Sequence, residues 1–332
     1  MNTQVFYMET GSIDPCFNLA FEEYVLTHRL TGTYLILWQN ENSIIIGQNQ
    51  NTEEEINRSY VDAHGVKVVR RTTGGGAVYH DTGNLNYSFI TDRTPNEVDS
   101  AKEWMMPVIH ALEKLGVHAE PSGRNDILVE GRKISGTAQR IFGSRILFHG
   151  TLLFDTDPEV VSSALRVNPK KFESKSVKSV RSRIGNIRDF LPVDMDMAAF
   201  WDFLKKTIFP DAIREVLSPA EMEEVLRLRE EKYSTFAWNF GRPIPYTFKN
   251  HRRWPGGILE IAVQVDSGRI KDIAFSGDFL STVPLDTLVE ALKGVPFSRS
   301  EIEKVLNRIP LQDYFGTISE KEVLDTFFEY SE

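Results

Sequence analysis

Three consecutive glycines, Gly74 to Gly76, separate two short runs of β-forming residues and follow a pair of arginines, Arg70 and Arg71. Glycine adopts positive φ without steric cost and, because it has no Cβ, lets another group approach the backbone N–H groups closely. The stretch therefore predicts a tight turn between strands, flanked by fixed positive charge, that can receive an anion or a polar head group. The alternative is a simple hairpin turn with solvated arginines.

The two familiar phosphate-binding motifs do not fit this stretch. A G-x-G-x-x-G motif counted from Gly74 would need glycine at its sixth position, which is Tyr79, and no Gly-Lys-Ser/Thr follows. A Rossmann or P-loop nucleotide-binding fold is therefore not supported.

A chain of 332 residues with 41% hydrophobic content is long enough for one large domain and a smaller one. Its formal net charge of -9 argues against a surface that attracts nucleic acid in general. Cys16 is the single cysteine, so an internal disulfide framework is excluded and a reducing compartment, the cytoplasm, is expected. The histidines show no metal-ligand spacing, and no apolar run is long enough to span a membrane.

Helical periodicity predicts a helix over residues 15–28, whose carboxylates Glu22 and Glu23 are expected on its solvated outer face. Two apolar runs, residues 33–38 and 43–47, are separated by four polar residues and predict a hairpin of buried strands. Residues 52–64 predict one helix that begins with a capping box. Strands and helices interleave and the strand connections resemble hairpins, so an α+β fold with a mixed sheet is expected.

A lysine stands at the exit of a second glycine turn. Asn125 and Asp126 precede a short predicted strand, Gly131 forms the turn after it, and Lys133 begins the next strand. A fixed ammonium group near the first glycine turn would stabilise the negative charge that develops when a carboxylate is activated on phosphate. The alternative is an ordinary surface lysine.

Between Lys170 and Arg188, seven basic residues stand against one acid, a local charge of +6 by subtraction. This segment is either a solvated loop or a mobile basic segment that meets phosphates or an acidic partner.

Two prolines and a glycine in residues 238–246 place a linker there, between a domain of residues 1–246 and one of residues 247–332. The second domain is expected to contain a hairpin that turns at Asp266-Ser267-Gly268 and to be accessory.

The two glycine stretches together resemble the lipoate–protein ligase family, which is part of the biotin/lipoate ligase group. The resemblance rests on RRTTGGGAVYHDTGN (residues 70–84) and GRNDILVEGRKISGTAQR (residues 123–140), with support from NLAFEE (18–23), FHGTLL (148–153) and SVRSRIGNI (179–187). It covers essentially the full length of the chain. It implies an α+β catalytic domain built on a mixed sheet, with a smaller C-terminal α/β accessory domain.

The resemblance also implies a two-step reaction. Lipoate or octanoate and ATP would give an enzyme-bound acyl-adenylate and pyrophosphate, and a lysine of an acceptor protein would then attack the mixed anhydride to form an amide. The implied acceptors are the lipoyl domains of 2-oxoacid dehydrogenases and the glycine cleavage H protein; no nucleic acid or membrane partner is expected. Mg²⁺ is expected with ATP, bound through phosphates rather than a protein cage, with Asn125 and Asp126 as candidate neighbours.

Carried over position by position, the resemblance assigns roles to residues of both stretches. Lys133 is the implied catalytic residue, which would bridge the acyl carboxyl group and the α-phosphate. The implied adenylate-binding residues are Arg71, Gly76, Ala77, Val78, Tyr79, Lys133, Arg181 and Arg183. The implied lipoate-binding residues are Arg71, Thr73, Gly76, His80, Lys133 and His149, with a role in the packed core as the alternative for both histidines. Residues 170–183 occupy the place of a loop that closes over the adenylate.

Three other functions are open at this point. An octanoyltransferase on the same fold would use a cysteine acyl-enzyme, for which Cys16 is the single candidate, but a small buried thiol is the expected role there. A module that holds lipoate or adenylate without turnover would show a broken lysine motif or a missing arginine, and neither is seen. Biotin ligation is disfavoured because residues 70–84 match the lipoate version of the motif.

Overall fold

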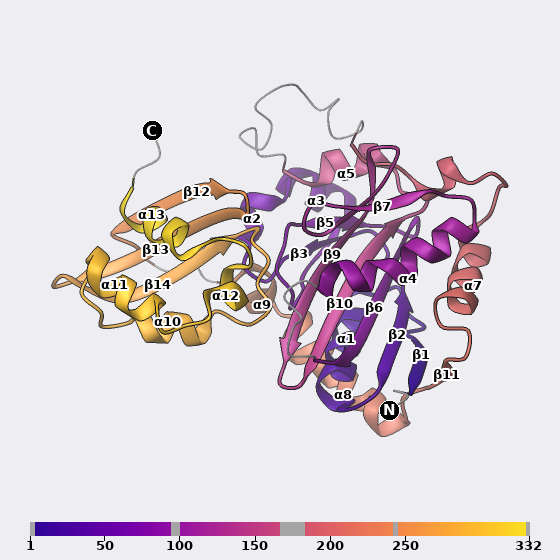
Figure 1. The fold of residues 1–332 in the computed structure, drawn as a ribbon, viewed down its shortest axis with the longest axis horizontal. Helices are drawn as coiled ribbons and strands as arrows, with labels where there is room; N and C mark the ends of the chain where they lie inside the picture. The colour runs from indigo at the N-terminus through magenta and orange to yellow at the C-terminus, as the bar shows by residue number, and fades with distance from the viewer. Residues whose placement is uncertain (1–3, 94–99, 167–182, 242–244, 330–332) are drawn as a thin grey trace.

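Two bodies of β-sheet, each covered by helices, make up the computed structural model of the chain (Figure 1). The structure describes residues 4–93, 100–166, 183–241 and 245–329. The larger body contains the chain up to α9 (Phe236–Phe240), and the smaller body contains the strands and helices that follow. No helix in these described ranges is long and apolar enough to cross a membrane.

Within the described residues, eight strands form the mixed sheet of the larger body, in the order β11-β1-β2-β6-β10-β9-β8-β7. β1 pairs in parallel with β2 and β11, whereas the other pairings are antiparallel. This arrangement confirms the expected α+β class with a mixed sheet. The strands are β1 (Val5–Glu9), β2 (Thr33–Trp38), β6 (Asn84–Asp92), β7 (Ala119–Ser122), β8 (Asp126–Val129), β9 (Arg132–Phe142), β10 (Arg145–Leu153) and β11 (Ile213–Arg214).

Helices cover both faces of this sheet, because alternate residues of its central strands enter two different cores. On β2, Leu35 and Leu37 belong to the core under α4 and α7, whereas Ile36 belongs to the core under α1 and α8. Each fully buried side chain of this size stabilises the fold by roughly 1.5–3 kcal/mol. Besides α2 and α3, which are described below, the described helices of the larger body are α1 (Pro15–His28), α4 (Ser100–Lys114), α5 (Pro158–Ala164), η3 (Ile187–Phe190), α7 (Met197–Ile208), α8 (Pro219–Leu228), η4 (Arg229–Tyr233) and α9.

A small second sheet carries the glycine stretch. β3 (Ser43–Ile46) lies between β4 (Lys67–Arg70), which is parallel to it, and β5 (Val78–His80), which is antiparallel. The predicted hairpin of residues 33–38 and 43–47 is therefore wrong: β2 and β3 belong to different sheets. The link between them contains Asn40, which is buried and hydrogen-bonded, so the chain leaves the large sheet instead of folding back on it. The glycine loop (residues 74–76) lies between β4 and β5 in the sequence. Because these two strands lie on opposite sides of β3, the loop is not a hairpin turn.

Residues 52–64 form two helices and not the single one expected. α2 (Thr52–Glu55) and α3 (Arg58–His64) are separated at Ile56, which is buried under the small sheet. Thr52 is not the capping residue, because its hydroxyl is buried and accepts a hydrogen bond of 2.7 Å from Arg70.

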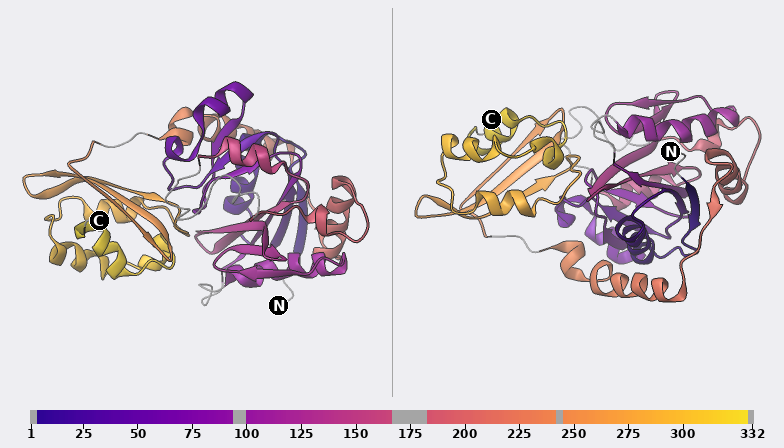
Figure 2. Two further views of the ribbon diagram at one scale, coloured as in Figure 1. Left: turned by 90° about the horizontal axis from the view of Figure 1, so that it is seen from above. Right: turned by 60° about the horizontal axis from the view of Figure 1, so that its bottom comes forward.

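The smaller body is a three-stranded antiparallel sheet with helices against it (Figure 2). The hairpin predicted at Asp266-Ser267-Gly268 is confirmed, and positive φ angles of 50° at Ser267 and 73° at Gly268 make its turn. Neither β12 nor α12 was expected, and the boundary placed after residue 246 stays a prediction. The elements are β12 (Phe248–Trp254), β13 (Gly257–Asp266), β14 (Arg269–Gly277), α10 (Asp286–Leu292), α11 (Arg299–Leu306), α12 (Leu311–Phe315) and α13 (Glu320–Phe328).

The two bodies meet through the last residue of β14, Gly277, and through residues 278–282, which follow it. The N–H of Gly75 donates to the carbonyl O of Phe279 (3.1 Å), and the N–H of Ile141 donates to that of Thr282 (2.7 Å). The smaller body therefore lies directly against the glycine loop and against β9.

Candidate active site

A cavity of about 120 Å³ lies where the glycine loop meets α1, β9 and β10. Leu19, Trp38 and Ile45 give it an apolar wall, and Asn125 lies at its polar side. The structure thus brings most of the predicted site residues together, while their roles toward a ligand stay predictions. The predicted residues that line it are Arg71, Gly76, Ala77, Val78, His80, Lys133 and His149.

The glycine loop (residues 74–76) needs its glycines for two different reasons. A Cβ on Gly74 would lie 2.6 Å from the backbone N of Ser281 in the smaller body, and Gly75 has a φ of +88°, which residues with a side chain rarely adopt. A Cβ on Gly76 would meet no atom within 4 Å. The first two glycines therefore allow the loop to pack, and the third leaves open space in front of the backbone.

Arg71 stabilises this loop through hydrogen bonds from its buried guanidinium group. Its guanidinium donates to Thr73 Oγ1 (2.9 Å) and to the carbonyl oxygens of Gly74 (2.6 Å) and Gly76 (2.9 Å). Burial lowers the pKa of Arg71 to about 10, and no carboxylate among the described residues forms an ion pair with it. Such a cation favours an anion in the adjacent cavity, because the low dielectric of the interior strengthens the attraction.

Arg70 turns the other way and does not line the cavity. Its guanidinium donates to the carbonyl oxygens of Gly47 (2.9 Å), Gln50 (2.7 Å) and Trp238 (3.0 Å). The first arginine of the pair therefore ties the strand end to the turn after β3 and to α9, a structural role.

Lys133 is held at the cavity by the predicted turn. Positive φ angles at Glu130 (50°) and Gly131 (74°) reverse the chain between β8 and β9. The Nζ of Lys133 lies 2.6 Å from Asp126 Oδ1, and 35% of its side chain is exposed. A Cβ on Gly136 would lie 3.0 Å from that Nζ, so glycine there leaves room for the lysine. The ammonium is thus fixed in direction and still accessible to a ligand.

The end of the basic segment reaches the backbone of Lys133. The Lys133 N–H donates to the carbonyl O of Arg183 (2.6 Å), and its carbonyl O accepts from the N–H of Gly185 (2.9 Å). Arg183 is exposed. Arg181, like the rest of residues 167–182, lies outside the described residues, so the adenylate contacts assigned to both arginines stay predictions.

A chain of buried hydrogen bonds joins α1 to the glycine loop. His149 Nδ1 lies 2.9 Å from Glu22 Oε1, and His149 Nε2 lies 2.8 Å from Thr73 Oγ1. Because Thr73 Oγ1 accepts from Arg71, its own hydrogen is available to His149. A ring that donates from Nδ1 to Glu22 and accepts at Nε2 from Thr73 satisfies every one of these contacts. His149 is therefore oriented by Glu22.

The expectation that Glu22 and Glu23 lie on a solvated face is wrong. Glu22 is only 2% exposed and accepts from Ser88 Oγ at 2.5 Å, and Glu23 accepts from Lys232 Nζ at 2.6 Å. The physical reason is that α1 is covered on two sides, by the sheet and by α8 with η4. The signal was present in the sequence: Asn18 and Glu22 are four residues apart and share the buried side of the helix.

His80 lies inside the site as a neutral residue. Its Nδ1 is 3.0 Å from the side-chain amide of Asn40. Burial, with help from the nearby charge of Arg71, lowers the pKa of His80 to about 3. Its Nε2 has no protein partner among the described residues, and the ring lines the cavity. This nitrogen is available to a ligand.

The side chains of three other predicted residues do not line the cavity. Tyr79 packs under the small sheet and donates to Asn42 Oδ1 (2.9 Å), so only its backbone is near the loop. Thr73 is fully buried, and its hydroxyl contacts His149 Nε2 (2.8 Å). Asp126 is occupied by Lys133, and the described residues contain no group of three or more His, Cys, Asp or Glu side chains that could hold a metal ion.

Cys16 does not line the cavity. Its Sγ donates to the carbonyl O of Tyr233 at 3.3 Å, and burial raises the pKa of the thiol. Both observations count against a cysteine acyl-enzyme, because the thiolate is the reactive form.

The chain matches two family models, and together they span most of its length. The lipoyl protein ligase A/B catalytic domain matches residues 14–209, and the bacterial lipoate protein ligase C-terminus matches residues 244–327. The chain belongs to the lipoate–protein ligase family. Lipoate–protein ligase 1 of Staphylococcus aureus is 42% identical over 322 residues, which are 96% of this chain and 98% of that protein. Lipoate-protein ligase LplJ of Bacillus subtilis is 43% identical over 321 residues, with 95% and 97% covered.

Solved structures of ligases share the fold. A bipartite lipoate protein ligase of Thermoplasma acidophilum, studied with its E2 lipoyl domain, has a TM-score of 0.65 and 30% identity, covering 75% of this chain and 100% of that one. A lipoate-protein ligase A bound with ATP has a TM-score of 0.63 and 28% identity, covering 73% and 99%. The match to the lipoate protein ligase C-terminus and the relatives named as ligases identify this chain as a ligase and not as the cysteine-dependent transferase considered above.

Proposed function

We propose that this lipoate–protein ligase activates lipoate or octanoate with ATP and transfers the acyl group to a lysine of an acceptor lipoyl domain. The observation that carries the proposal is the meeting of Lys133, the glycine loop and Arg71 at one cavity with an apolar wall. An accessible ammonium, open backbone and a buried cation suit the polar part of an acyl-adenylate, and the apolar wall suits the acyl chain.

In the first step a carboxylate oxygen of lipoate attacks the α-phosphorus of ATP, and pyrophosphate leaves with the electron pair of the broken P–O bond. Lys133 is accessible at the cavity while its Nζ is held 2.6 Å from Asp126, so it can turn its charge toward both the acyl oxygen and the α-phosphate. Charge that develops on these oxygens is then stabilised by a group already in position.

In the second step the amine of the acceptor lysine attacks the acyl carbon of the mixed anhydride, and AMP leaves. The amine must lose a proton first, because a free lysine has a pKa of about 10.4. Lys133 is suited to this step as well, since the negative charge of the departing AMP arises next to the same ammonium group.

The binding roles proposed for the other residues follow the lining of the cavity. Gly76, Ala77 and Val78 border the open space beside the loop and would receive the adenylate. His80 and His149 lie with the apolar wall and would contact the acyl chain. Mg²⁺ is proposed to arrive with ATP, bound through its phosphates near Asn125. The acceptors are proposed to include the glycine cleavage H protein, and the compartment to be the cytoplasm.

The proposal is tested by incubating the purified enzyme with lipoate, MgATP and an apo lipoyl domain, and measuring the intact mass of the domain. The expected result is the gain of one lipoyl group per domain, dependent on ATP. A domain whose acceptor lysine is replaced by arginine is the matched control. No mass gain with either the lipoyl domain or the H protein, under conditions where the enzyme is folded, would contradict the proposal.

A further inference from the structure

A second cavity, of about 550 Å³, lies between the two bodies of the molecule. Small-molecule sites in proteins typically occupy about 300–1,000 Å³. The larger body contributes Trp104, Ile146 and Phe148, with the Trp104 and Phe148 rings stacked at 5.5 Å, and the smaller body contributes Leu280 and Pro310. The interior of this interdomain cavity is therefore largely apolar and partly aromatic.

The interdomain cavity does not coincide with the active-site cavity. Neither Lys133 nor any residue of the glycine loop lines it. Four residues line both cavities, which are therefore adjacent: Asn125, Thr137, Ala138 and His149. A molecule bound in the interdomain cavity thus lies beside the acyl-adenylate site without occupying it.

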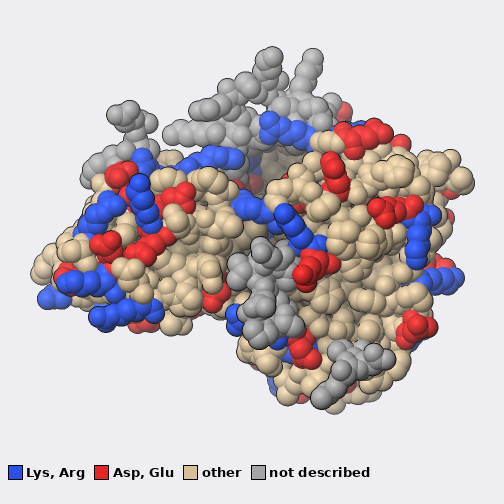
Figure 3. Space-filling model, viewed as in Figure 1, with Lys and Arg blue, Asp and Glu red and all other residues tan. Residues whose placement is uncertain are grey.

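Basic side chains dominate the charged residues around the interdomain cavity. Arg93, Lys102 and Arg124 line it, against the single carboxylate of Asp313, which leaves +2 by subtraction. None of the three cations forms an ion pair with a described carboxylate, and Arg124 donates to the carbonyl O of Gly256 in the smaller body. Figure 3 shows Lys and Arg side chains along the junction of the two bodies on this face. The cavity therefore favours a ligand with an anionic end.

We infer that the interdomain cavity is a binding site for an aliphatic monocarboxylic acid of medium to long chain, separate from the site of acyl activation. The chain would lie between Trp104, Phe148 and Leu280, and the carboxylate would face Arg93 and Lys102. Burial of each further methylene group removes apolar surface from water, so affinity rises with chain length up to the volume of the cavity. A free phosphate would leave the aromatic wall unfilled.

Because the walls of the interdomain cavity come from both bodies, a bound ligand would also stabilise the contact between the bodies. Leu280 and Thr282 belong to the segment whose backbone holds the smaller body on the glycine loop and on β9. Because the complete cavity exists only while this contact is made, a bound acid stabilises the contact in proportion to its affinity for the closed cavity.

The test is isothermal titration of the full-length enzyme with hexadecanoate, kept below its micelle concentration. Hexadecanoate is chosen because the active-site cavity, about 120 Å³, is far smaller than the interdomain one. We expect saturable binding at one site that lipoate, at a concentration that just saturates pyrophosphate exchange, does not displace, and weaker binding of decanoate. In Arg93→Glu/Lys102→Glu, the affinity falls about tenfold or more, because two exposed attractions become repulsions. Lipoate-dependent pyrophosphate exchange is unchanged in that variant.

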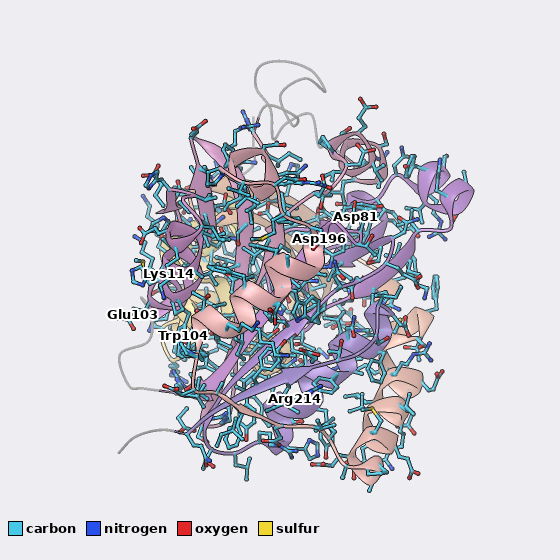
Figure 4. The ribbon with its side chains drawn as sticks, turned by 90° about the vertical axis from the view of Figure 1, so that its right-hand side faces the viewer. Asp81, Glu103, Trp104, Lys114, Asp196 and Arg214 are labelled. Atoms are coloured by element: carbon cyan, nitrogen blue, oxygen red, sulfur yellow. The ribbon has the colours of Figure 1, made fainter. Side chains whose placement is uncertain are left out.

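Lys114→Glu/Lys321→Glu is the matched control, since both lysines are exposed and neither lines the cavity. Lys114 ends the same helix, α4, near whose start Trp104 and Lys102 lie, and Figure 4 labels both Trp104 and Lys114. The control should bind hexadecanoate like the wild type. Absence of binding, displacement by lipoate at that concentration, or equal affinity in the two double variants would overturn the inference. The inference would also be overturned if the wild type did not bind hexadecanoate and Arg93→Glu/Lys102→Glu lost acyl transfer to the acceptor. That result would assign the cavity to the protein partner.

Discussion

Replacement of Lys133 by alanine separates catalysis from folding more clearly than any other change at the site. The lysine contributes one ion pair, to Asp126 at 2.6 Å, and both side chains are about one-third exposed. Pairs this accessible to solvent contribute at most about 1 kcal/mol to stability. The variant is therefore expected to fold, with a melting temperature within a few degrees of the wild type.

The effect on adenylation should be much larger. Loss of one preorganised group that stabilises transition-state charge typically lowers kcat by about 10²–10³-fold. Lys133→Ala is therefore expected to lose at least about that factor in lipoate-dependent pyrophosphate exchange, mainly in kcat, with circular dichroism melting as the control for folding. Lys114→Ala, on the exposed end of α4, should leave the exchange rate unchanged. Near-normal exchange by folded Lys133→Ala would refute the assignment of the catalytic charge to this residue.

Four further changes test other parts of the account. Glu22→Gln removes the carboxylate that orients the site histidine, so we expect a raised KM for lipoate with little change in the KM for ATP; equal changes in both would contradict this role. The depressed pKa of His80, about 3, lies below its unfolded value of about 6.5, so the unfolded state binds more protons and the free energy of unfolding falls as pH drops from about 6.5 toward 3. His80→Asn should flatten that slope in urea unfolding, and an unchanged slope would show that another group causes it. Cys16→Ser should transfer lipoate at the wild-type rate, because the thiol does not line the cavity; complete loss of transfer would instead support a cysteine acyl-enzyme. Neutralising Arg181 and Arg183 together should increase hydrolysis of the adenylate to free lipoate and AMP, measured without acceptor, and unchanged leakage would argue against their adenylate role.

The local parts of the site were accessible from the sequence because they depend on neighbouring residues. The turn at Gly131 and the position of Lys133 after it follow from positive φ at two successive residues. The convergence of Lys133 with the glycine loop is different. It depends on β9 and the small sheet meeting in space, and only the resemblance to a family suggested it before the structure did.

The failures have a common physical cause, which is coverage by elements distant in sequence. Glu22 and Glu23 were assigned to solvent because one face of an amphipathic helix is normally exposed. Instead, Glu22 faces the sheet, where it contacts Ser88 and His149, and Glu23 is covered by η4, about 200 residues later. The hairpin of β2 and β3 failed because two apolar runs with a polar link look the same whether they pair with each other or with other strands. The interdomain cavity left no sequence signal, since its walls come from both bodies.

The central claim is that the cavity beside the glycine loop forms an acyl-adenylate. Exchange of labelled pyrophosphate into ATP by the purified enzyme, with lipoate or octanoate and without any acceptor protein, measures that half-reaction alone. The account predicts exchange that requires the acid and is lost in Lys133→Ala. Absence of exchange in a folded sample with both acids would contradict it and would leave acyl transfer without adenylation, or activation that needs the acceptor, to be explained.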